Sequence, residues 1–184
     1  MSKKPAQVEE VVDPAVEIQD EFPGEFAPDA AMVITENFDT EAEYKPVPLI
    51  PKGKYHANVT QVAFDPENQI IVWTATLNDN EGRVKLDGES PVDGSTLNFK
   101  NWLPLPGDEK VMTKTGSQTK RQAKINMLQD FAKEMKIDMR TPTAILTALS
   151  GQEWLGLSVI VEIGFRTWQN RTFNNIDRMY AYGG

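Results

Sequence analysis

Apolar and polar positions alternate with a period of two in several stretches of the chain, and this alternation is typical of β-strands. Tyr55, Ala57 and Val59 alternate with more polar neighbours in the first stretch, and Asp65-Pro66-Glu67-Asn68 has the composition of the turn that ends it. The other stretches are rich in β-branched and aromatic residues, which are also frequent in strands. The five predicted strands cover residues 54–64, 69–77, 95–103, 157–166 and 172–182.

Two helices are predicted between the third and fourth strands. The first covers about residues 120–136, and its apolar face is formed by Ile125, Leu128, Phe131, Ala132 and Met135. Thr119 and Gln122 have the spacing of a capping box at its start. The second helix is shorter, with Thr141 as its N-cap, Pro142 at its first position and Gly151 just past its end.

The order of these elements predicts the fold class. The predicted order is three strands, a helical insertion and two more strands joined by a turn at residues 167–171. An oligonucleotide-binding (OB) barrel has this order. We therefore expect a mainly β (β+α) domain, a five-stranded OB-fold barrel with the helical insertion between strands three and four. A small α+β sandwich has the same order and remains an alternative.

Negative charge is concentrated at the N-terminus. Residues 1–45 contain three lysines and twelve acidic residues, about −9, whereas residues 46–184 sum to about +1. Prolines, many carboxylates and scattered apolar residues are typical of disorder. We predict a disordered acidic arm over 1–45, a stiff proline-rich connector over 46–52 and the OB-fold domain over 53–184.

Several function classes are disfavoured. The chain has no Cys, so it has no disulfide, no thiolate nucleophile and no Cys-based metal site. His56 has no partners at metal-ligand spacing, and neither a phosphate-binding glycine loop nor a nucleophile elbow occurs. No apolar run approaches the ~20 residues of a membrane span. We expect no enzyme, no cofactor, no metal and no membrane contact, with the protein in the cytoplasm.

A run of cations without acids follows the third strand. The predicted phosphate contacts in this run are Lys110, Lys114, Lys120, Arg121 and Lys124. Three of these five lie in or beside the first turn of the first helix, where the helix dipole already places roughly half a positive charge. Their clustering is unfavourable unless an anion such as phosphate binds there. An ordinary solvated face is the alternative.

Aromatic rings that stack on bases are the second requirement for holding single-stranded nucleic acid. The stacking candidates are Trp168, Trp102 and Trp73. Trp168 lies in the predicted 167–171 turn, and Arg166 and Arg171 beside it are further candidates for phosphate contact. Trp73 lies in the apolar run from Ile70 to Trp73, which favours a core position over a stacking role. Packing roles are expected for Tyr55, Trp154 and Phe173.

Short motifs in the domain resemble a known family. The run from Pro51 to Val59 is similar to the "Pro-x-Gly-x-Tyr" opening of bacteriophage single-stranded DNA-binding proteins with an OB-type core, and residues 156–161 and 173–178 resemble later parts of that family. The resemblance covers about residues 51–182. It implies sequence-tolerant binding of single-stranded DNA in phage replication or recombination, in the cytoplasm of the bacterial host.

The acidic arm leaves other functions open. In the related bacterial proteins an acidic partner-binding tail usually lies at the C-terminus, whereas here the acidic segment is N-terminal. The arm could contact phage or host replication or recombination proteins, or compete with the ligand for the domain's basic groove. The alternatives are a phage structural or adaptor module that binds protein, and an inhibitor that mimics DNA through the arm.

Overall fold

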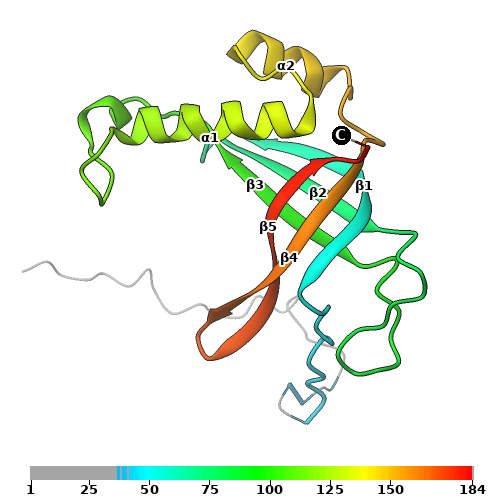
Figure 1. Cartoon of the computed structure of the whole chain (residues 1–184). Helices are drawn as coiled ribbons and strands as arrows, with labels where there is room; N and C mark the ends of the chain where they lie inside the picture. Colours follow the sequence, from blue (N-terminus) through cyan, green and yellow to red (C-terminus); the bar gives the residue numbers. More distant parts are fainter. Residues whose placement is uncertain (1–36, 38, 41, 184) are drawn as a thin grey trace, which may run out of the picture. The chain divides into compact units, whose positions relative to one another are not determined.

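Five antiparallel strands form one sheet, accompanied by two helices (Figure 1). The computed structural model describes residues 37, 39–40 and 42–183. By its internal contacts the chain divides into two units, with the boundary between Lys45 and Pro46. The predictions for residues 1–36 and Phe38 lie outside the described residues. The elements of the second unit are β1 (Gly53–Asp65), β2 (Ile70–Leu77), β3 (Thr96–Trp102), the 3-10 turn η1 (Asp108–Lys110), α1 (Lys120–Met135), α2 (Pro142–Ser150), β4 (Ser158–Trp168) and β5 (Arg171–Ala181). The predicted mainly β class with five strands is confirmed.

The strands lie in the order β3-β2-β1-β4-β5. β1 joins the two halves of the sheet, because residues 53–58 pair with β4 and residues 57–65 pair with β2. A bulge at Thr60, between Val59 and Gln61, interrupts the pairing with β2, and bulges of this kind bend a strand and increase its twist. β3 and β5 are the edges, so the sheet is open between them. The closed barrel remains a prediction.

The core is organised around the second strand. In β2 the side chains of Ile71, Trp73, Ala75 and Leu77 are buried, and the residues between them face the other side of the sheet. Trp73 is completely enclosed, and its indole Nε1–H donates to Asn101 Oδ1 at 2.7 Å. Its ring lies 5.0 Å from that of Trp154 and 5.2 Å from that of Phe131, centroid to centroid. The prediction that Trp73 stacks on bases is wrong, because nothing can reach its ring.

α1 packs on this core and touches both edges of the sheet. Phe131 stacks on Phe99 of β3 at 5.3 Å, and Glu134 pairs with Arg178 of β5. Thr119 caps α1 as predicted, but Gln122 Nε2 donates to Asn126 instead of returning to the cap. Figure 1 shows α1 running across the sheet. Of the helices in the described part of the chain, none is both long and apolar enough to cross a membrane.

The end of the 46–52 connector is folded onto the domain. Ile50 is 3% exposed, and its backbone N–H and C=O both bond to the side-chain amide of Asn174 at 2.8 Å. Tyr55 Oη donates to the C=O of Pro51, and the Leu86 N–H donates to the C=O of Leu49, each at 2.8 Å. The connector therefore belongs structurally to the domain at this end.

Replacing Trp73 by Ala should lower the free energy of unfolding by about 3–5 kcal/mol, because it leaves a large cavity and removes the donor to Asn101. Urea unfolding followed by circular dichroism measures this change. Trp102→Ala is the matched control, since the Trp102 side chain is 46% exposed, and should cost less than about 1 kcal/mol. Equal losses from the two variants would contradict the assignment of Trp73 as the centre of the core.

Candidate nucleic-acid interface

The last two strands extend past the rest of the sheet as a two-stranded arm. β1 begins at Gly53 opposite Ile163, so the paired residues 164–168 and 171–175 continue with no third strand of the described chain beside them. We call residues 164–175 the hairpin arm, and Figure 1 shows it projecting from the sheet. Its turn consists of Gln169 and Asn170, at φ 47° and 60°, as in a type I′ turn. The predicted turn over 167–171 is too long, because Trp168 and Arg171 pair with each other.

One face of the hairpin arm alternates cations and aromatic rings. Arg166 lies opposite Phe173, and Trp168 lies opposite Arg171. Alternate residues of a strand share a face, so these four side chains project together. We call them the hairpin face. All four are exposed, Trp168 by 60% and Phe173 by 46%.

The role of Phe173 differs from the expectation from sequence. It is not a packing residue, because nearly half of its side chain is exposed and it shares a face with the three predicted residues. The missing information was the strand register. A turn of two residues, rather than five, places Phe173 on the same face as Trp168.

Several cations on the body of the domain are paired with acids. Lys54 pairs with Glu162 at 3.2 Å, Arg140 pairs with Asp138, and Arg178 pairs with Glu134. In addition, the Lys54 ammonium and the Arg178 guanidinium lie over the Tyr180 ring, at 5.7 and 5.6 Å. Arg166 belongs to none of the ion pairs found among the described residues. The hairpin arm thus carries a cation, Arg166, that lies outside these ion pairs.

Lys124 is the predicted phosphate contact that the structure assigns elsewhere. Its Nζ lies 2.8 Å from Asp108 Oδ2 and 3.1 Å from the C=O of Leu103, and the Lys124 and Asp108 side chains are only 20% and 12% exposed. Asp108 Oδ2 also accepts from the Leu105 N–H at 2.8 Å. This cluster fastens the β3–α1 connection to the helix. The prediction for Lys124 is wrong, because its charge is already satisfied.

The remaining predicted lysines lie on and around an ordered finger, residues 111–120. The finger closes through Lys120 N–H to Val111 C=O at 2.7 Å and Thr113 N–H to Gln118 C=O at 2.8 Å. Lys114 lies near the tip of the finger, Lys110 precedes the finger in η1, and Lys120 begins α1. With Arg121 these cations are exposed, and the first turn of α1 contains no acid to offset them.

A second aromatic and basic surface lies on the outer side of β2 and β3. Trp102 pairs with Ile70, Lys100 with Val72 and Asn98 with Thr74, and all six point away from the buried side of β2. We call these residues the sheet face. Lys100 was missed by sequence reasoning, because only its position opposite Val72 shows that it shares a face with Trp102.

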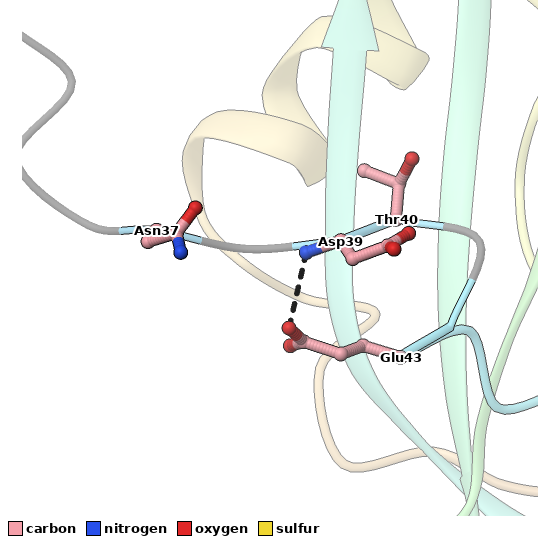
Figure 2. Close-up of a pocket in the computed structure, with 4 residues that line it drawn as sticks. All are labelled: Asn37, Asp39, Thr40 and Glu43. Atoms are coloured by element: carbon pink, nitrogen blue, oxygen red, sulfur yellow. Dashed lines mark hydrogen bonds between the residues drawn. The ribbon is translucent and has the colours of Figure 1, made fainter.

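The described residues before the connector form a surface of opposite character. Asn37, Asp39, Thr40 and Glu43 line a shallow pocket, in which the Asp39 N–H donates to Glu43 Oε1 at 3.1 Å (Figure 2). The Glu43 N–H donates in turn to the C=O of Asp39 at 2.9 Å. Carboxylates that line a pocket repel phosphate, so this pocket is not part of the candidate interface.

Comparison with protein-family models and with curated proteins finds no match to this chain. Exposed rings next to cations can stack on planar groups and attract anions at the same time. This combination occurs on the hairpin face and, with one ring, on the sheet face.

The Asp108–Lys124 contact should make the stability of the folded domain depend on pH in the acidic range. The hydrogen bond from Lys124, and then that from the Leu105 N–H, lower the pKa of Asp108 below its ordinary value of 3.8. A carboxyl whose pKa is lowered by folding stabilises the folded state above about pH 4 and loses that contribution as pH falls through its folded pKa. Asp108→Asn should therefore lower the melting temperature at pH 7, and the difference from the parent should shrink toward pH 3.

Thermal melts at pH 7, 5 and 3 measure this effect. Asp130→Asn, which removes an exposed carboxylate from α1, is the control and should leave the melting temperature nearly unchanged. A deficit in Asp108→Asn that stays constant from pH 7 to pH 3 would contradict the role given to the ionised carboxylate.

Proposed function

We propose that this protein binds single-stranded DNA without reading its sequence, and that it is not an enzyme. The observation that supports this most directly is the hairpin face, on which two arginines alternate with two exposed aromatic rings. Rings stack on bases of any sequence because every base has a π-face, and cations beside them attract the phosphates between the bases. No base-edge donor or acceptor is required for such binding.

A single strand suits this face better than a duplex. The bases of a duplex already stack on each other, so an exposed Trp168 or Phe173 ring gains little from duplex DNA. In a single strand the bases are free, and stacking contributes about 1–3 kcal/mol per base. Trp102 and Lys100 on the sheet face provide a further ring and cation for the same strand.

We also propose that the sheet is an OB-type barrel that is open along one seam. An OB barrel is a partly open five-stranded sheet that binds oligonucleotides on its second and third strands and on the loops between strands one and two and between strands four and five. The strand order is that of such a barrel interrupted between β3 and β5. Cα atoms of β3 and β5 approach within 8 Å, and α1 contacts both strands. The two candidate surfaces then lie at OB ligand positions.

In this proposal the protein coats single-stranded DNA during phage replication or recombination, as the resemblance of residues 51–182 implies. The cations of the finger and Lys110 follow the phosphates, and the acidic arm contacts a phage or host replication or recombination protein. A protein-binding adaptor and a DNA mimic remain the alternatives, and both predict that oligo-dT leaves tryptophan fluorescence unchanged.

Oligo-dT should quench the tryptophan fluorescence of the full chain, because stacking on a base quenches indole. Most of the quenching should disappear in Trp168→Phe, which keeps an aromatic ring but removes the fluorophore. Trp154→Phe is the matched control, since Trp154 is 4% exposed, and its quenching should equal that of the parent. Absence of quenching in the parent, or tighter binding to duplex than to oligo-dT, would reject the proposal.

Affinity for oligo-dT should fall steeply with salt. A plot of log affinity against log salt has a slope of about −0.7 for each phosphate that is neutralised on a single strand. Arg166→Ala should make that slope shallower by about 0.7. Arg140→Ala is the matched control, because Arg140 is paired with Asp138, and should leave the slope unchanged. Equal slopes for the parent and Arg166→Ala would remove Arg166 from the interface.

A further inference from the structure

The two faces of the hairpin arm have different neighbours. Arg166, Trp168, Arg171 and Phe173 form the hairpin face described above. The intervening side chains, Phe165, Thr167, Thr172 and Asn174, project from the opposite face. Contacts to the connector occur on this opposite face, behind the rings and cations.

Asn174 holds the connector as a neighbouring strand would. Its Oδ1 accepts from the N–H of Ile50 and its Nδ2 donates to the C=O of Ile50, both at 2.8 Å. A strand satisfies a backbone residue through the same pair of bonds in a ladder. Lys52 adds a second contact, because its Nζ lies 5.1 Å from the centre of the Phe165 ring. Ile50 is 3% exposed, so the contact is anchored in the core.

The hairpin arm needs such support. A two-stranded hairpin is marginal in water by itself, and a third strand or a packed element is required for stability. The turn adds little stability, because Gln169 and Asn170 occupy left-handed positions that favour Asn followed by Gly. The connector supplies the missing third element on one face and leaves the other face open.

We propose that Asn174 is a positioning residue, which holds the hairpin arm against the connector so that the rings and cations of the opposite face are ordered before the ligand binds. This inference rests on the proposed function. Binding to an arm that is already ordered avoids the entropy cost of ordering it at the moment of contact. Asn174 acts through the arm and does not touch the nucleic acid.

Hydrogen exchange of the full chain without nucleic acid tests the clamp. In Asn174→Ala the amides of residues 164–175 should exchange faster, while those of β2 and β3 keep the parent rates. Thr172→Ala is the matched control, because it shortens a polar side chain on the same face of β5. Lys52→Met approaches the clamp from the connector and should also accelerate exchange in the arm. Parent-like exchange in Asn174→Ala, or faster exchange throughout the sheet, would overturn the inference.

Oligo-dT binding tests the consequence for function. Asn174→Ala should raise the Kd by roughly 3- to 10-fold, the cost of ordering a few side chains. The slope against log salt should stay at the parent value, since no cation is lost, whereas Arg166→Ala changes it. A parent-like Kd in spite of faster exchange would overturn the positioning role. Failure of the unmodified chain to bind oligo-dT would instead overturn the proposed function, and the exchange result would still report on the clamp.

Discussion

The enclosed indole of Trp73 is the contact on which the rest of the domain depends. It lies in β2, bonds to Asn101 of β3, packs against the tilted ring of Phe131 in α1 and stacks on Trp154 before β4. These residues are far apart in the sequence, so their meeting fixes which side of the sheet is buried. Once the odd-numbered residues of β2 face inward, its even-numbered residues must face outward. The sheet face with Trp102 and Lys100 follows from this choice.

The alternation of side chains along a strand also gives the hairpin arm two faces with different roles. A bulge near Asp177 shifts the register between β4 and β5 and places the Asp177 carboxylate against Gly164, where a Cβ would lie 2.0 Å from Oδ2. Beyond this point the alternation continues to the turn. Asn174 and Phe165 face the connector, and Arg166 and Trp168 face away from it. A one-residue change in the turn would shift β5 against β4 and move Asn174 to the face that carries Arg166 and Trp168.

Local patterns made the elements predictable, and their arrangement in space was harder to predict. The five strands and the N-caps Thr119 and Thr141 could be read from alternation and cap chemistry, because both are local. The roles of Trp73, Lys124 and Phe173 could not. Each depends on a partner that lies far away in the sequence or on a register set by a turn, namely Trp154, Asp108 and the Gln169–Asn170 turn.

The local pairing of each cation describes the surfaces of this chain better than its net charge does. Lys54, Lys124 and Arg178 are all paired with acids, but only the Lys124–Asp108 pair is largely buried, where a cation near a low-dielectric interior needs a partner. Lys114 and Arg166 lie on the finger and the hairpin arm, where water solvates them and no such partner is needed. The net charge of −8 therefore says little about what approaches these extensions. A ligand meets the local field of each projection, which is positive where the chain as a whole is negative.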